Sequence, residues 1–380
     1  MTDSGITSVA MPKWGLSMRS GKITDWVVAE GDPVAPGDDL ADIETEKITG
    51  TLEADAGGIV RRVIATVGED VPVGAAIALI APPDVPDAVL DDLAARARAV
   101  IDAGLPEDDG AGPVVETVEA GGRKVSYAGA GDSGDVVLLV HGYGGDRNSW
   151  LFLQEPLAAR HRVYALDLPG HGTSAKDVGD GSVDLLADAV LGVLDAVGSD
   201  RAHLVGHSLG GAVVLAAAAR SPGRIASLTL FAPAGFGPSI SAGYVRGFAA
   251  AQTRRELKPL VGQLFADEQL VTRQVVDDLL AYKWLDGVDE ALAALAETLL
   301  DGDEQRIDSA AAVRALGEVV PVTVVWGSAD RIIPAEQASS VAAVAPGAAV
   351  RVIDGAGHMP HMERPAEAQA AVEETIARAG

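Results

Sequence analysis

The sequence contains no cysteine. Disulfide bonds, thiolate metal sites and a cysteine nucleophile are therefore all excluded. Basic residues are also scarce, because 29 lysines and arginines stand against 55 aspartates and glutamates, for a formal net charge of −26. Since a nucleic-acid backbone and an anionic membrane surface both attract a basic face, we expect neither as a partner.

Long apolar runs are missing too, and no uninterrupted apolar stretch is long enough to cross a bilayer. The opening residues, MTDSGITSVAMPKWGLSM, lack a basic segment followed by an apolar one, so we expect no secretory signal. The expected location is the cytoplasm. The histidines and carboxylates show no spacing typical of a metal site, and we predict no bound metal.

The chain is long enough for two domains, since 380 residues exceed one ordinary domain. Its composition, 48 % hydrophobic and 22 % charged, is typical of globular proteins. Shifts in composition divide it into a first domain over residues 1–83, a linker over 84–113 and a second domain over 114–380.

The first domain contains an internal repeat. A shift of 37 residues aligns glycines with glycines, apolar residues with apolar residues and acid with acid. The positions Gly21, Ile23, Trp26, Val27, Gly31, Asp32, Val34, Gly37, Leu40 and Ile43 fall on Gly58, Val60, Val63, Ile64, Gly68, Glu69, Val71, Gly74, Ile77 and Ile80. Short β-rich runs and glycine turns in both halves predict two similar four-stranded halves, packed as a small β-sandwich or flattened barrel.

The junction between the halves reads DIETEKITG, residues 42–50, and contains Lys47. In a pseudosymmetric sandwich this junction is an exposed hairpin tip, so we expect Lys47 to face solvent. A plain charged turn is the simplest interpretation. The repeat, the turn position and the acidic flank of Glu44 and Glu46 together favour a site of modification instead.

Residues 7–80 resemble a lipoyl domain, with AMPKWGLSM as its first strand and DIETEKITG as its lipoylation turn. The resemblance implies that Lys47 carries lipoic acid in amide linkage. The related biotinyl domains usually flank their lysine with methionines, whereas Glu46 and Ile48 stand here. Biotin is therefore the weaker interpretation.

The linker, residues 84–113, holds eight acids and two bases. Its middle, VLDDLAARARAVI, has apolar residues at helical spacing, which predicts a short helix between flexible ends. Two interpretations fit this pattern. The segment is either a plain acidic spacer or a helix whose apolar stripe docks a partner or the second domain.

Residues 114–380 alternate apolar β-rich runs with helical patterns, which predicts an α/β sheet with mainly parallel strands. Candidate catalytic residues follow three of these apolar runs. GHSLGG, residues 206–211, is a G-x-S-x-G nucleophile elbow, whose glycines leave room for a tight strand-to-helix bend that projects Ser208. Asp330 follows VTVVW, and His358 follows VRVI. A lone G-x-S-x-G is a weak signal, but three such elements in the order Ser, Asp, His are specific.

This half of the chain resembles the α/β-hydrolase family, including HGYGG and LDLPGHGTS. The resemblance implies that Ser208 is the nucleophile, His358 the general base and Asp330 the orienting acid. It places the oxyanion hole at the backbone N–H groups of Tyr143 and Leu209. It also implies a helical lid over about residues 234–320, where we expect most of Tyr244, Phe248, Phe265, Tyr282 and Trp284 to pack the lid and one or two to line an acyl pocket.

Other residues compete for these roles. His361 lies three residues after His358 and is an alternative base, and Asp354 is a second choice for the acid. Side chains of adjacent residues at an elbow diverge, so we expect His207 to be structural. His141 and His171 lie in glycine-rich loops and are expected to shape them.

Together the two halves resemble the lipoyl-bearing acetyltransferase component of the acetoin dehydrogenase complex. The resemblance implies acetyl transfer from the lipoyl arm to coenzyme A. It also implies two partners, a thiamine diphosphate-dependent acetoin-cleaving component and a dihydrolipoyl dehydrogenase.

One motif departs from ordinary 2-oxo acid dehydrogenase acyltransferases, which use His-x-x-x-Asp-Gly. Here Val350 stands at the histidine position before Asp354 and Gly355, so that route is absent. Enzymatic acyl transfer then has to use the Ser208 site. Two alternatives stay open: a serine esterase or thioesterase that releases free acid, and a lipoyl carrier whose hydrolase domain is only a scaffold.

Overall fold

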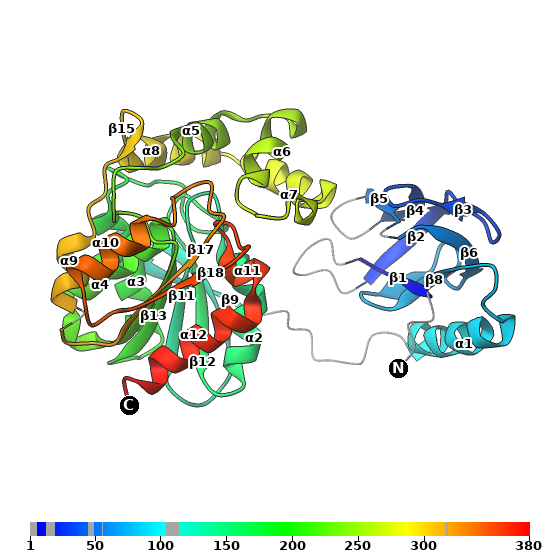
Figure 1. Ribbon diagram of the computed structural model, residues 1–380, viewed down its shortest axis with the longest axis horizontal. Helices are drawn as coiled ribbons and strands as arrows, with labels where there is room; N and C mark the ends of the chain where they lie inside the picture. The colour runs from blue at the N-terminus through cyan, green and yellow to red at the C-terminus, as the bar shows by residue number, and fades with distance from the viewer. Residues whose placement is uncertain (1–5, 13–19, 45–48, 55, 104–113, 317) are drawn as a thin grey trace. The chain divides into compact units, whose positions relative to one another are not determined.

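The computed structural model describes residues 6–12, 20–44, 49–54, 56–103, 114–316 and 318–380. The chain divides into two compact units, Met1–Gly112 and Pro113–Gly380, whose elements are labelled in Figure 1. No helix in these ranges has the length and apolar character needed to cross a membrane.

The first unit contains two four-stranded antiparallel sheets, with the orders β1-β8-β6-β3 and β5-β4-β2-β7. Its strands are β1 (Thr7–Ala10), β2 (Ser20–Trp26), β3 (Pro33–Val34), β4 (Asp39–Glu44), β5 (Thr49–Glu53), β6 (Gly58–Val63), β7 (Asp70–Pro72) and β8 (Ala76–Ala81). Each sheet takes two strands from the first half of the repeat, β1–β4, and two from the second, β5–β8. The halves therefore interleave and share one core.

Turn geometry explains the repeated glycines. Four of them have positive φ angles, a conformation that other residues adopt only with strain: Gly31 (99°), Gly37 (92°), Gly68 (89°) and Gly74 (83°). The N–H of Gly31 donates to the carbonyl of Val60 at 2.7 Å, and that of Gly68 donates to the carbonyl of Ile23 at 2.7 Å. The shift of 37 residues relates one bond to the other. The glycines that repeat in the sequence therefore form structurally equivalent turns in the two halves.

Helix α1 (Asp87–Ala103) lies in the segment predicted as the linker, and its apolar stripe packs on the first unit. The buried residues of the stripe are Leu90, Ala97 and Ile101. Arg61 binds Asp87 at 2.9 Å. The Arg98 guanidinium pairs with Glu69 and lowers the pKa of that carboxyl to about 2. The predicted helix is confirmed. Both interpretations of its segment were wrong, because the apolar stripe is neither a spacer nor docked on the second domain and instead covers the core of the first unit.

The second unit is built on an eight-stranded sheet of order β18-β17-β14-β13-β11-β12-β10-β9. The strands are β9 (Val115–Ala120), β10 (Arg123–Ala130), β11 (Val136–Val140), β12 (Arg162–Asp167), β13 (Ala202–His207), β14 (Ile225–Phe231), β17 (Val322–Gly327) and β18 (Ala349–Ile353). β10 pairs antiparallel with β9 and with β12, and every other neighbouring pair is parallel. The antiparallel start and parallel centre are as predicted.

Helices cover both faces of this sheet (Figure 1). One face packs against α3 (Val183–Ala196), α4 (Leu209–Arg220), α9 (Ala310–Leu316) and α10 (Gln337–Val344). The other packs against α2 (Leu151–Ala158) and α12 (Pro365–Ala377). Alternation along β11 serves both cores, because Leu138 belongs to the first and Leu139 to the second. The shorter helices η1 (Arg147–Trp150), η2 (Pro222–Arg224) and α11 (Pro360–Glu363) lie in connections.

Between β14 and β17 the chain forms a helical cap, which lies at one end of the sheet in Figure 1. It comprises α5 (Ala242–Ala250), α6 (Arg254–Gly262), η3 (Glu268–Leu270), α7 (Arg273–Lys283), α8 (Val288–Leu299), β15 (Leu300–Asp301) and β16 (Glu304–Gln305). The ammonium of Lys283 is buried and donates to the carbonyl of Ala249 at 3.0 Å and to Asp289 at 2.8 Å. This bond pair ties α7 to α5 and α8.

Candidate active site

Ser208 lies on the turn between β13 and α4. Its φ of 52° is unusual for a residue with a side chain. Two hydrogen bonds hold the turn: the N–H of Ser208 donates to the carbonyl of Phe231 at 2.9 Å, and the N–H of Ala234 donates to the carbonyl of Ser208 at 3.1 Å. The surrounding structure thus maintains a strained backbone at a position where the sequence predicted the nucleophile.

Close backbone contacts explain the two glycines of the elbow. A Cβ atom on Gly206 would lie 2.5 Å from the carbonyl oxygen of Gly210. One on Gly210 would lie 2.3 Å from the carbonyl oxygens of Val140 and His141. Because backbone atoms cannot move aside as a flexible side chain can, both positions need glycine. The predicted lack of room for side chains is confirmed.

His358 and Asp330 form a buried pair, with exposed side-chain fractions of 2 % and 0 %. Nδ1 of His358 lies 2.8 Å from Oδ2 of Asp330, which also accepts a bond from Nε1 of Trp326 at 3.1 Å. The other carboxylate oxygen accepts from the N–H groups of Ile332 and Ile333 at 2.8 and 2.9 Å. These donors fix the carboxylate, which in turn favours the His358 tautomer with its proton on Nδ1.

Asp354 and His361, the alternatives for the acid and the base, lie in different environments from Asp330 and His358. Asp354 is exposed and accepts a bond from the hydroxyl of Ser328 at 3.1 Å. The His361 ring packs on Trp150, with centroids 4.5 Å apart, and neither of its nitrogens has a hydrogen-bond partner in the described ranges. Burial lowers the pKa of His361 to about 3, so this imidazole is neutral and has no carboxylate to orient it.

The other histidines support the loops around the site. Nε2 of His207 bonds the carbonyl oxygen of His358 at 2.9 Å, and burial lowers the pKa of His207 well below its usual value. His141 and His171 each accept a bond from a backbone N–H, at 3.0 and 3.1 Å. All three side chains are buried, and the structure agrees with the loop-shaping roles expected for them.

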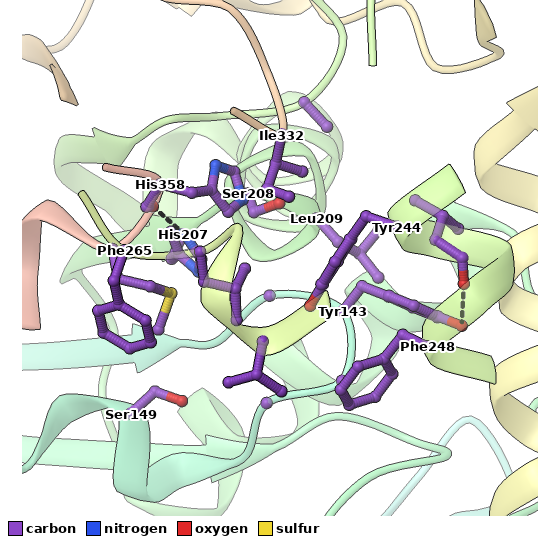
Figure 2. A pocket seen from close by; sticks show the side chains of 18 of the residues that line it. Tyr143, Ser149, His207, Ser208, Leu209, Tyr244, Phe248, Phe265, Ile332 and His358 are labelled. Carbon is purple, nitrogen blue, oxygen red and sulfur yellow. Dashed lines mark hydrogen bonds between the residues drawn. The ribbon is translucent and has the colours of Figure 1, made fainter. Parts of the chain in front are cut away.

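Ser208 and His358 line one cavity of about 150 Å³, which Figure 2 shows from close by. The lining side chains are mostly apolar and include Tyr244, Phe248, Val261, Leu264, Phe265, Ile332, Met359 and Met362. Of the five aromatic residues considered for an acyl pocket, three line it; the hydroxyl of Tyr282 instead donates to the carbonyl of Gly170 at 2.9 Å, and Trp284 is 66 % exposed. An apolar cavity of ~150 Å³ holds a group about the size of benzene.

Tyr143 and Leu209 line the same cavity. Their backbone N–H groups have no acceptor in the part of the chain that the structure describes, so both are available to a negatively charged oxygen. The N-terminus of α4, which begins at Leu209, favours negative charge at the same place. The hydroxyl of Tyr143 donates to the carbonyl of Leu292 at 3.0 Å and ties this loop to α8 of the cap, a long-range contact that no sequence motif indicates.

Lys47 lies outside the described residues. The strands that precede and follow it in the chain, β4 and β5, are paired up to Glu44 and Thr49. Within the described ranges, no group of three or more histidine, aspartate or glutamate side chains is arranged to hold a metal ion.

Comparison with known proteins identifies both units. Residues 135–365 match the model of the alpha/beta hydrolase fold, and residues 7–80 match the biotin/lipoyl model, described as biotin-requiring enzyme. The dihydrolipoyllysine-residue acetyltransferase component of the acetoin cleaving system of Pseudomonas putida is 45 % identical over 361 residues, which cover 95 % of each chain. The chain belongs to this family of acetyltransferase components. A second member, from Cupriavidus necator, is 43 % identical over 94 % of each chain.

Solved structures resemble the hydrolase part of this acetyltransferase component. A meta-cleavage product hydrolase from Pseudomonas fluorescens has a TM-score of 0.63 at 21 % identity, covering 70 % of this chain and 98 % of that one. An esterase from Thermogutta terrifontis has a TM-score of 0.58 at 27 % identity, covering 70 % and 99 %. The predicted fold class, a flattened lipoyl sandwich followed by an α/β-hydrolase fold, is confirmed.

Proposed function

We propose that the protein transfers an acetyl group from a thioester on its lipoyl arm to coenzyme A, with Ser208, His358 and Asp330 as catalytic residues. One observation carries the proposal. A strained serine and a buried histidine–aspartate pair meet at one small apolar cavity, in a chain that also has a lipoyl domain. A serine that forms an acyl intermediate is the chemistry that such a set performs.

The lipoyl domain implies covalently bound lipoic acid, and we infer that Lys47 is the attachment residue. Two observations support this inference: Lys47 comes between two paired strands in the sequence, and no methionine flanks it. When bound, lipoic acid supplies sulfur that holds an acyl group as a thioester, a chemistry that a chain without cysteine lacks.

Ser208 accepts the acyl group first. Its Oγ would attack the acyl carbonyl carbon while Nε2 of His358 took the hydroxyl proton. The N–H groups of Tyr143 and Leu209 would donate to the negatively charged oxygen, and Asp330 would stabilise the imidazolium. His358 would then return the proton to the sulfur that the acyl group leaves.

The acyl group next leaves Ser208. The thiol of coenzyme A attacks the ester carbonyl, and Nε2 of His358 takes the thiol proton. As the C–O bond breaks, His358 returns this proton to Oγ of Ser208, so the enzyme regains its starting state. The cavity of about 150 Å³ supports a short acyl group such as acetyl.

Membership in a family named for a component of the acetoin cleaving system implies partner components. We propose a thiamine diphosphate-dependent component that cleaves acetoin and loads the arm, and a dihydrolipoyl dehydrogenase that reoxidises it. The alternative function with specific support is a serine esterase or thioesterase, because an esterase is among the similar structures.

One experiment separates these functions. Purified lipoylated protein receives acetyl-dihydrolipoamide and coenzyme A, and acetyl-CoA and acetate are quantified. We expect acetyl-CoA, formed at a rate that falls at least ~10³-fold in Ser208→Ala and in His358→Ala. Acetate alone would identify a hydrolase. If both variants form acetyl-CoA as fast as the wild type, the second unit is only a scaffold and does not catalyse the transfer.

A further inference from the structure

We propose that a basic groove on the exposed face of cap helix α6 binds the phosphate groups of coenzyme A. The proposal rests on coenzyme A as the acceptor and names the place that recognises it. The groove has a volume of about 600 Å³ and is lined by Arg254, Arg255, Lys258, Pro259, Gly262, Glu268 and Val271.

Charge is the first argument. Coenzyme A carries a pyrophosphate and a 3′-phosphate, whereas this chain has a net charge of −26 and repels polyanions at long range. A local group of cations is therefore needed. Arg255 and Lys258 pair with no carboxylate in the described ranges, while Arg254 is bound to Asp277 at 2.6 Å. The groove's own carboxylate, Glu268, is paired with Arg331 at 2.7 Å.

The position of these cations within α6 is the second argument. Arg254 and Arg255 are the first two residues of the helix, after the N-cap Thr253. The helix dipole favours acidic side chains there and disfavours basic ones. Two adjacent arginines thus oppose the local stability of α6, which a binding role explains. A planar guanidinium matches a phosphate with two parallel hydrogen bonds, and Lys258 adds a compact charge one turn away.

The groove adjoins the catalytic cavity, which is the third argument. Val261 of α6 lines the cavity, and the next residue, Gly262, lines the groove. Val271 lines the groove, and Val275, one turn further on, lines the cavity. The two hollows therefore share α6 and the start of α7 as a common wall. Phosphates held in the groove leave the long pantetheine arm to carry the thiol towards Ser208.

The test compares two acceptors that share the thiol arm. Coenzyme A has the phosphates and pantetheine lacks them, so the ratio of their kcat/KM values isolates phosphate recognition. We expect the double variant Arg255→Glu with Lys258→Glu to lower this ratio at least ~10-fold, because it removes two charge-assisted phosphate contacts and introduces repulsion. Arg255 lies in the first helical turn, where glutamate suits the helix dipole, and an unchanged melting temperature of the double variant checks the fold.

Arg314→Glu is the matched control, since this exposed arginine of α9 lines neither hollow, and its ratio should equal that of the wild type. High salt should lower the wild-type ratio by screening the phosphates. If the double variant keeps the wild-type ratio, the groove does not bind the phosphates. Acetyl-CoA formation in that case still supports the proposed transferase function. Wild-type protein that yields acetate alone with both acceptors overturns the proposed function and the groove together.

Discussion

Three histidines pack ring against ring at the active site, and their hydrogen-bond partners give them different roles. The His207 ring lies 4.8 Å from that of His358 and 4.7 Å from that of His361, between centroids. His358 bonds a carboxylate, His207 bonds a backbone carbonyl, and His361 bonds nothing in the described ranges. Both partners select one tautomer, but within this cluster only His358 bonds a carboxylate, which also stabilises a positive charge on the ring.

The orienting role proposed for Asp330 predicts that a small chemical change at this residue has a large effect on activity. Asp330→Asn replaces an acceptor with an amide that can donate to Nδ1, which favours the wrong tautomer of His358. We expect kcat on a short acyl ester to fall ~10⁴-fold. Asp354→Asn is the control, because this exposed carboxylate contacts Ser328 and not His358. Similar losses in both variants would contradict the assignment of Asp330.

The buried His361 predicts a contribution to the pH dependence of stability. Burial lowers its folded-state pKa to about 3, below an unfolded-state value of ~6.5, so the unfolded chain takes up the proton first. The neutral His361 therefore contributes to the free energy of unfolding fully above pH ~6.5, and this contribution is lost as the pH falls towards 3. At pH 5 the loss is about 2 kcal/mol.

His361→Phe keeps a ring against Trp150 and removes this titration. Urea unfolding of the second unit at pH 7.5 and pH 5 measures the effect. We expect the free energy of unfolding to drop by ~2 kcal/mol less in the variant than in the wild type. Equal drops in the two proteins would show that His361 does not titrate as a buried neutral group.

At the scale of elements, α1 and α6 each depend on one buried face. Leu90 of α1 is fully buried in the first unit, whereas the neighbouring Val89 is 44 % exposed. In α6, Leu257 and Val261 are buried while Arg255 and Pro259, on the far side of the helix, are exposed. A helical period of 3.6 places these opposite characters on one short segment, which lets α6 wall the catalytic cavity and carry cations at once.

The packing of α1 predicts that Leu90→Ala destabilises the first unit by ~2–5 kcal/mol, because it removes buried methyl groups and leaves a cavity. Hydrogen exchange measured by mass spectrometry should then quicken in β6 and β8, the strands that α1 contacts. Val89→Ala should change exchange little, as an exposed substitution costs within ~0.5 kcal/mol. Unaltered exchange in β6 and β8 after Leu90→Ala would argue against this packing.

At the scale of the whole molecule, the two units have separate hydrophobic cores and separate tasks. One unit presents the residue proposed to carry the acyl group, and the other contains the groups proposed to transfer it. The chain between their described parts, residues 104–113, reads GLPEDDGAGP and contains three acidic residues, three glycines and two prolines.

The proposed carrier predicts a mass change at one residue. Protein produced in cells with lipoylating enzymes should show one lipoyl group by intact-mass measurement, and Lys47→Arg should lose it because arginine cannot form the amide. Lys22→Arg, an exposed lysine of β2 in the same unit, should keep the group. A lipoyl mass that survives Lys47→Arg, or that is absent from the wild type, would refute the attachment site.

Local sequence by itself determined the turns and the elbow. The repeated glycines and the two elbow glycines answer requirements set within a few residues, a positive φ or a nearby backbone atom, and those requirements are visible as residue types. Apolar runs likewise predicted the central strands, since a strand buried on both faces has to be continuously apolar. The order of Ser208, Asp330 and His358 completed the fold assignment.

Only the tertiary structure decided which distant residues meet. Asp330 rather than Asp354 reaches His358, three of the five candidate aromatics line the cavity, and α1 covers the first unit. The strands of the two repeat halves also interleave between sheets. Each outcome depends on packing between segments far apart in the chain, where the direction of a side chain is set by the fold around it and not by its sequence neighbours.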